Sequence, residues 1–150
     1  MDQPKALSKQ IVANVGLYWT SYRLSLGGWN ALPTSRNAKG VDLIIYNEDA
    51  SKTATIQVKS LSKLVRISTR TGLPTGQDVG VGSRSHMMAN YYVICTGVAN
   101  AEDIPSCFIL TRAEAVKALA ADADGEQEWL DHKRYGVEAN REAWAKIRGR

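Results

Sequence analysis

Three polar residues on two neighbouring stretches have the types needed to hold a metal ion and act on a phosphate: Asp42, Gln57 and Lys59. Carboxylate and amide oxygens are ligands for hard cations such as Mg²⁺, which keeps water in its remaining octahedral positions. The lysine ammonium can stabilise negative charge on a phosphate or lower the pKa of an attacking water. These residue types therefore predict metal-assisted hydrolysis.

The elements that must position these residues are two short runs, 40–46 and 53–59, both dense in β-branched residues and separated by a polar turn. This pattern predicts an antiparallel hairpin. A turn centred near Asp49 and Ala50 places Asp42 opposite Gln57, so both lie on one face with Lys59. The opposite face then carries only apolar side chains: Val41, Leu43, Ile45, Ala54, Ile56 and Val58. A slip of one residue would mix the two faces, so the pattern supports this register.

The spacing of the three polar residues also matches a known pattern. Asp42, fourteen intervening residues and then Gln57-Val58-Lys59 resemble the D…(D/E)xK signature of the PD-(D/E)XK nucleases, which include many restriction enzymes and Holliday junction resolvases. Glutamine in place of the second acid is similar to the QxK variant of Mrr-type restriction endonucleases. The resemblance is concentrated in residues 30–60, where the basic, glycine-ended segment 33–40 is similar to the approach to the catalytic strand. Without it, the same residues would also fit a half-solvated hairpin face whose charges only keep the sheet soluble.

The resemblance implies an α/β fold in which a restriction-endonuclease-like mixed central β-sheet is flanked by helices, with residues 1–150 as a single domain. It implies that Asp42, Gln57 and the Val58 carbonyl bind Mg²⁺ or Mn²⁺ and that Lys59 assists the attacking water. The expected partner is nucleic acid, with DNA as the expected substrate, and a homodimer is an open alternative to a monomer because a duplex has two strands to cut.

A catalytically inactive nuclease-fold module that binds nucleic acid or a protein partner is the alternative. Gln57 in place of an acid lowers the negative charge at the site and so weakens metal binding. The first helix is expected over residues 5–26, and its apolar side is expected to carry Leu7, Ile11, Val15, Tyr18 or Trp19, and Tyr22. This helix carries no acid. In the nuclease family this helix sometimes offers an acidic ligand. Its nearest polar substitutes are Gln10 and Asn14, unless these are ordinary solvent-facing residues.

Basic and amide side chains around the hairpin are the candidate phosphate contacts. The chain has a net charge of +4 and a pI near 9.1, which mildly favours a polyanionic partner. Residues 68–85 are rich in glycine, threonine and serine and predict a long basic flap or, alternatively, a solvated loop. The candidate nucleic-acid-binding residues are Arg36, Asn37, Lys39, Lys63, Arg66, Arg70 and Arg84.

The rest of the chain completes one globular domain by its length of 150 residues. Strands are expected over 29–33, 91–95 and 107–110, followed by a helix that starts at the capping box of Thr111 and Glu114 and by a short helix over 139–148. The two cysteines, Cys95 and Cys107, lie in apolar runs without metal-ligand spacing and are expected to be reduced core residues of a cytoplasmic protein, with a disulfide between them as the alternative. No run is long and apolar enough for a membrane span, and no signal peptide is expected.

Overall fold

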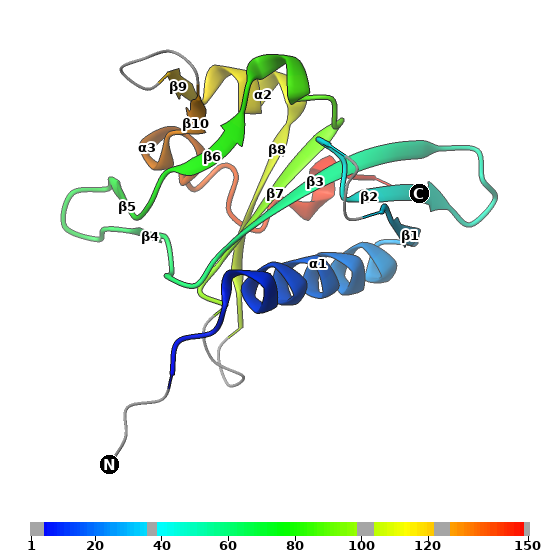
Figure 1. The fold of residues 1–150 in the computed structure, drawn as a ribbon, viewed down its shortest axis with the longest axis horizontal. Coiled ribbons are helices and arrows are strands. Elements are labelled where there is room, and N and C mark those ends of the chain that lie inside the picture. Colours follow the sequence, from blue (N-terminus) through cyan, green and yellow to red (C-terminus); the bar gives the residue numbers. More distant parts are fainter. Residues whose placement is uncertain (1–4, 36–38, 99–103, 122–126, 149–150) are drawn as a thin grey trace.

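The computed structural model describes residues 5–35, 39–98, 104–121 and 127–148. Its centre is a five-stranded sheet of order β1-β2-β3-β7-β8, in which β3 and β7 are parallel and every other pair is antiparallel. The strands are β1 (Trp29–Pro33), β2 (Leu43–Asn47), β3 (Thr53–Leu61), β7 (Tyr91–Thr96) and β8 (Ser106–Thr111). Helices lie on both sides of this mixed sheet (Figure 1), so the expected fold class is confirmed.

The predicted hairpin is present, in the predicted register. Leu43 pairs with Ile56 and Ile45 with Ala54, and all four side chains are buried. Ala50 closes the turn with a positive φ of 57°. The alternation of apolar and polar residues therefore identified both the pairing and the buried face of this part of the sheet.

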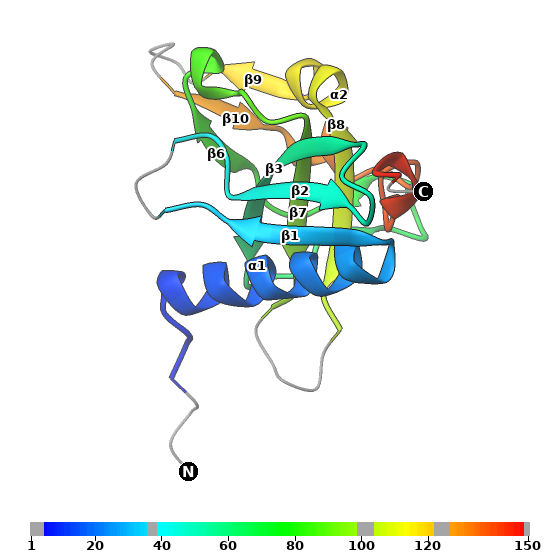
Figure 2. The same ribbon diagram turned by 90° about the vertical axis from the view of Figure 1, so that its right-hand side faces the viewer.

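The first helix, α1, spans Lys9–Leu26 and begins at Ser8, whose hydroxyl accepts a hydrogen bond from the Ile11 N–H at 3.3 Å. Figures 1 and 2 show it along one side of the central sheet. The predicted core-facing side of this helix is right only for Val15 and Trp19, which are partly buried and pack against the core. Ile11 is 45% exposed and Tyr22 54% exposed, and Leu7, in the segment before the helix, is 45% exposed. The buried face consists of Val12, Gly16, Thr20 and Leu24.

The reason is the close approach of α1 to the sheet. A Cβ on Gly16 would collide with the Ser60 Oγ of β3, and the Thr20 hydroxyl lies 3.4 Å from the Cys95 Sγ of β7. Small side chains on this face let the helix backbone lie near the strands, as larger apolar groups could not. Close packing at Gly16 and Thr20, together with burial of the apolar Val12 and Leu24, therefore decides which side of α1 is buried.

Two hydrophobic clusters cover the two faces of the central sheet. On β7, Val93 and Cys95 belong to one cluster and Tyr92 and Ile94 to the other, as the alternation of a strand requires. The cluster on the α1 side contains Val12, Leu24, Trp29, Leu43, Ile45, Ala54, Ile56, Val93, Cys95, Val98, Cys107, Ile109 and Ile147. The second cluster lies against the smaller elements on the opposite side, where Figure 2 shows α2, β9 and β10.

After Lys59, the strands expected over 91–95 and 107–110 are confirmed as β7 and β8, but shorter elements stand where the sequence predicted a long loop and two helices. They are β4 (Arg66–Ile67), β5 (Pro74–Thr75), β6 (Val79–Gly82), η1 (Arg84–His86), α2 (Arg112–Lys117), β9 (Leu119–Ala121), β10 (Glu128–Leu130), α3 (His132–Tyr135) and η2 (Trp144–Lys146). The long loop predicted over 68–85 thus contains two short strands and the start of a 3₁₀ turn. The capping box of α2 is confirmed, but α2 ends at Lys117, because the chain continues into β9 of the β6-β10-β9 sheet. Within the expected helix over 139–148, only η2 is helical.

Both cysteines are free and buried, as predicted. They face each other on β7 and β8, with 3.2 Å between the two sulfur atoms. The hydrogen bond with Cys95 and the burial both raise the pKa of the Cys107 thiol. In the described part of the chain, no helix is long and apolar enough to cross a membrane.

Candidate active site

Asp42 lies at the point where the β2–β3 ladder ends. Its N–H donates to the Ile56 carbonyl at 2.8 Å, and its carboxylate Oδ2 accepts the Val58 N–H at 2.7 Å. The second bond ties the carboxylate to the peptide group that joins Gln57 to Val58. The other oxygen, Oδ1, accepts no hydrogen bond from the described residues, so it is free to bind a ligand.

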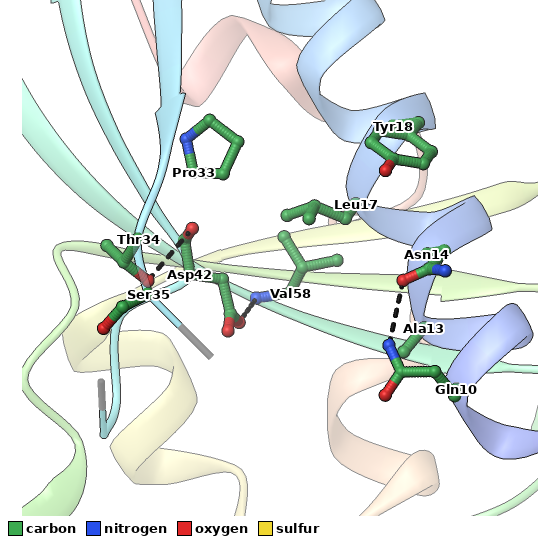
Figure 3. Close-up of a pocket in the computed structure, with 10 residues that line it drawn as sticks. All are labelled: Gln10, Ala13, Asn14, Leu17, Tyr18, Pro33, Thr34, Ser35, Asp42 and Val58. Atoms are coloured by element: carbon green, nitrogen blue, oxygen red, sulfur yellow. Dashed lines mark hydrogen bonds between the residues drawn. The ribbon is translucent and has the colours of Figure 1, made fainter. Parts of the chain in front are cut away.

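A cavity of about 420 Å³ opens beside this carboxylate, between α1 and the end of β1. Figure 3 shows α1 side chains on one side of the cavity and Asp42 with Thr34 and Ser35 on the other. The Thr34 hydroxyl donates to the Val41 carbonyl at 2.6 Å, which fastens the segment after β1 to the segment before β2. The lining residues are Gln10, Ala13, Asn14, Leu17, Tyr18, Pro33, Thr34, Ser35, Asp42 and Val58.

Gln57 is the buried polar residue of β3. Its side chain is 8% exposed, and its Oε1 is buried without a hydrogen-bond partner among the described residues. It stands beside Tyr92 of β7, on the face of the sheet that carries the second cluster. A buried acceptor without a donor is costly, by about 1–3 kcal/mol, unless water or a cation satisfies it.

Lys59 follows Gln57 on the same face of β3 and is half-buried. Its ammonium forms no hydrogen bond or ion pair with any residue that the structure describes. It therefore keeps all three of its donors for a ligand or for water.

The predicted sharing of one face by Asp42, Gln57 and Lys59 differs from the structure. Val41 packs against the second cluster together with Leu61, whereas Asp42 lines the cavity on the α1 side together with Val58. The regular pairing ends at Leu43 and Ile56, so residues 41–42 no longer follow the alternation of the strand. The Asp42 carboxylate reaches β3 through the Val58 N–H instead, and Gln57 and Lys59 do not line the cavity.

The donor set nevertheless fits a hard cation. Asp42 has a carboxylate oxygen with no hydrogen bond from the described residues and Gln57 has an unsatisfied amide oxygen, and oxygen is the ligand that Mg²⁺ and Mn²⁺ prefer. The two side chains lie on opposite faces of the sheet, so a cation could be held by both only after the Gln57 side chain turns toward the α1 side. The Val58 carbonyl belongs to the same segment.

Helix α1 forms one wall of the cavity, and two of its residues there, Gln10 and Asn14, were considered in the sequence analysis only as polar substitutes for a missing acid. Gln10 and Asn14 do line the cavity that contains Asp42, and the Gln10 Nε2 donates to the Asn14 Oδ1 at 3.0 Å. Leu17 and Tyr18 complete this wall and were not identified as site residues. The available signal was their spacing, since residues 10, 14, 17 and 18 recur on one side of a helix.

The predicted nucleic-acid-binding residues are dispersed. Arg36 and Asn37 lie outside the described residues, and Lys39 is exposed beside the cavity-lining segment. Arg84 is exposed and forms an ion pair with Glu128 at 3.3 Å. The other three, Lys63, Arg66 and Arg70, are exposed beyond the end of β3, and Arg66 lines a separate cavity of about 640 Å³. Of the five that the structure describes, none is among the residues that line the Asp42 cavity.

A second group of possible metal ligands was not found from the sequence. Asp78, Asp131 and His132 place one ligand atom each within 4.8 Å of one another. All three already have structural bonds: the His132 Nδ1 lies 2.7 Å from the Asp78 Oδ1, and Asp131 caps α3. Partial burial alone would raise the pKa of Asp78, but hydrogen bonds from His132 outweigh it and hold the pKa below its ordinary value.

Comparison with known proteins supports the fold. No protein-family model and no curated protein matches the sequence. Among solved structures, the chain is similar to the bacterial homing endonuclease I-Ssp6803I, with a TM-score of 0.51 and 16% sequence identity over 93% of this chain and 92% of that one. At this level of identity the similarity concerns the fold, and function has to be argued from the site. The chain thus shares the mixed α/β fold of a known endonuclease.

Proposed function

We propose that this chain is a nuclease of the PD-(D/E)XK type that uses Mg²⁺ or Mn²⁺ to hydrolyse phosphodiester bonds in nucleic acid, with DNA as the substrate. One observation carries the proposal: the Asp42 carboxylate is bonded to the peptide group next to Gln57, whose own Oε1 is buried and unsatisfied. The fold shared with a homing endonuclease supports it.

Each residue has a distinct part in this proposal. Asp42 Oδ1 would bind the cation with the Val58 carbonyl, and Gln57 Oε1 would join them after its side chain turns toward the α1 side. When bound, a divalent cation polarises the phosphate and lowers the pKa of a water molecule. The Lys59 ammonium, which has no partner among the described residues, donates to the phosphate or to the attacking water and so offsets the developing negative charge.

The predicted nucleic-acid-binding residues contact backbone phosphates away from the phosphate that is cut. They are Arg36, Asn37, Lys39, Lys63, Arg66, Arg70 and Arg84. Residues 1–150 act as one domain, and pairing of two copies would provide a site for each strand of a duplex.

A nuclease-fold module that binds nucleic acid without cutting it is the second candidate. It is favoured by the charge of the site, because Asp42 is the only carboxylate among the described residues that line the cavity and α1 carries no acid. A site with one carboxylate binds Mg²⁺ more weakly than a site with two.

The two candidates are separated by a cleavage assay. Plasmid and branched duplex DNA are incubated with the parent protein in Mg²⁺, in Mn²⁺ and in EDTA. Asp42→Asn removes the charge but keeps an acceptor for the Val58 N–H, so the variant should fold normally and lose cleavage. Lys59→Met keeps the length of the side chain and should also lose cleavage. Asp49→Asn, in the exposed turn of the same hairpin, is the matched control and should cut as the parent does.

The outcomes are distinct. Full cleavage by Asp42→Asn would show that the assigned site is wrong. Salt-sensitive DNA binding by the parent without cleavage in either metal would favour the binding module.

A further inference from the structure

The cavity beside Asp42 has the chemistry of a site for a nucleobase. We propose that it receives one unpaired base of the substrate, next to the phosphate that is cut, with the base stacked on Tyr18 and its edge bonded to Gln10 and Asn14. This inference rests on the proposed function and names its substrate class: DNA with an extrahelical or single-stranded nucleotide at the cleavage point.

The charge of the described walls disfavours a phosphate as the main occupant. Among the described residues that line the cavity, Asp42 is the only charged one, and its charge is negative. The remaining lining groups are apolar side chains, hydroxyls and amides, as in sites that bind neutral heterocycles. The volume of about 420 Å³ lies within the range of sites for small organic ligands, roughly 300–1,000 Å³.

Tyr18 supplies the stacking surface. Its side chain is 67% exposed although it lines the cavity, and its ring contacts no other aromatic ring among the described residues. The neighbouring exposed tyrosine on α1, Tyr22, is instead paired with Trp19 at 5.6 Å between ring centroids, and neither of these lines the cavity. A tyrosine held on a helix without a ring partner can stack a base with little loss of side-chain entropy.

The two amides supply hydrogen bonds to the edge of the base. The bond from Gln10 to Asn14 uses one donor and one acceptor and leaves a free acceptor on Gln10 and a free donor on Asn14. Reversing both amides would still leave one free donor and one free acceptor. Every base presents an adjacent donor and acceptor on its Watson–Crick edge, so this pair can bond an unpaired base. Gln10, Asn14 and Tyr18 follow one another at intervals of four residues, so they lie on one side of α1.

The geometry requires the base to leave the stack. A base inside a duplex is covered on both faces and cannot place its ring against a side chain of a helix. Leaving the stack costs least for a base that is already unpaired, as in a bulge, a flap or a single strand. The cavity therefore selects DNA in which such a nucleotide is present.

The test uses 2-aminopurine, a fluorescent base that is quenched by stacking. Two duplexes of otherwise equal sequence carry it either as a single bulged nucleotide or paired with thymine. Binding is measured by anisotropy and quenching in EDTA, so that no hydrolysis takes place. The parent should bind the bulged duplex more tightly than the paired one and quench its fluorescence. Tyr18→Ala should weaken binding of the bulged duplex about 5- to 100-fold and leave the paired duplex unchanged.

Tyr22→Ala is the matched control, because it removes an exposed tyrosine from the same helix outside the cavity. It should bind both duplexes as the parent does, and Tyr18→Trp should retain the preference. Equal affinity of Tyr18→Ala and the parent for the bulged duplex would overturn the proposal. So would equal weakening by Tyr18→Ala and Tyr22→Ala together with a change in sedimentation, which would assign the outer side of α1 to contact between two copies.

The same experiment tests the proposed function independently of the base site. Quenching and a preference for the bulged duplex, without cleavage of either duplex after Mg²⁺ or Mn²⁺ is added, would refute hydrolysis and support the base site. Metal-dependent cleavage with equal affinity for the two duplexes would support hydrolysis and refute the base site.

Discussion

Replacing Gln57 by glutamate puts a full negative charge where the structure has a buried amide. The Gln57 side chain is 8% exposed and its Oε1 has no partner among the described residues, so the new carboxyl would lie in a poorly solvated position. Without metal, burial raises the pKa of a carboxyl above its ordinary value of about 4.3. Lys59 on the same face of β3 partly opposes this rise, so we expect a shift of roughly one to two pH units.

This shift lowers the stability of the variant at neutral pH. Each unit is worth about 1.4 kcal/mol, so the loss is roughly 1.4–2.8 kcal/mol, or about 3–10 °C in Tm for a chain of this size. The folded-state pKa lies above the unfolded one, so the loss is complete above the folded pKa and disappears as the pH falls below the unfolded pKa. The Tm difference between variant and parent should therefore shrink between pH 7 and pH 4.

Metal should reverse the loss. A carboxylate brings a charge where the amide brings a dipole, and we expect Mn²⁺ to bind the variant about tenfold more tightly, which is roughly 1.4 kcal/mol. Saturating Mn²⁺ should then raise the Tm of Gln57→Glu by several degrees more than that of the parent. Thermal unfolding and calorimetric titration with Mn²⁺ measure both effects. Thr53→Glu, which adds the same charge at an exposed position of β3, is the matched control and should show neither.

The refuting result is equal Mn²⁺ affinity for Gln57→Glu and the parent. It would show that residue 57 is not a metal ligand, and the pairing of Asp42 with Gln57 would be wrong. Tighter binding that lowers the Mn²⁺ concentration needed for cleavage would support a weakly charged but catalytic site. Tighter binding with no cleavage would support the module that only binds.

Two further predictions concern the helix and the basic residues. Gly16→Ala should lower the free energy of unfolding, measured in urea, by about 1–3 kcal/mol, because the new methyl meets Ser60. Ser60→Ala alone should be neutral or stabilising, because the Ser60 hydroxyl is buried without a partner among the described residues. Equal stability of Gly16→Ala and the parent would contradict the close packing of α1. Neutralising Arg66, Arg70 and Arg84 together should weaken binding to all DNA sequences alike and reduce the slope of log affinity against log salt by roughly one unit for each arginine that binds a phosphate. An unchanged slope would remove these residues from the interface.

The sequence predicted the elements whose signals are local. The hairpin was predictable because β-branched residues alternate with polar ones over two runs of adequate length, and its register follows from the same alternation. The capping box at Thr111 is equally local, since both partners lie within four residues. The three polar residues of the hairpin were chosen as site residues by their type and spacing and by the family resemblance, and their role stays a prediction.

The elements that depend on distant partners were not predictable in this way. The strands β6 and β10 are four and three residues long and gain their stability from pairing between segments that are far apart in the chain. A short apolar run gives no periodicity by which such a partner could be identified. The buried side of α1 was missed for a similar reason: Gly16 and Thr20 are inside because β3 and β7 lie close, which a helical pattern of large apolar residues does not reveal.

Two features that the sequence analysis missed build the candidate site: the direction of the Asp42 side chain and the buried side of α1. A strand that alternated regularly through residue 42 would turn the Asp42 side chain to the face of Gln57, away from α1. Because the ladder ends at Leu43, the carboxylate instead bonds to the Val58 N–H and borders the cavity. The small residues on the inner side of α1 bring that helix close enough for Gln10, Asn14 and Tyr18 to form the opposite wall. A larger residue at position 16 would move this wall away from Asp42. The same close packing that holds α1 on the sheet therefore also sets the width of the cavity in which the substrate would lie.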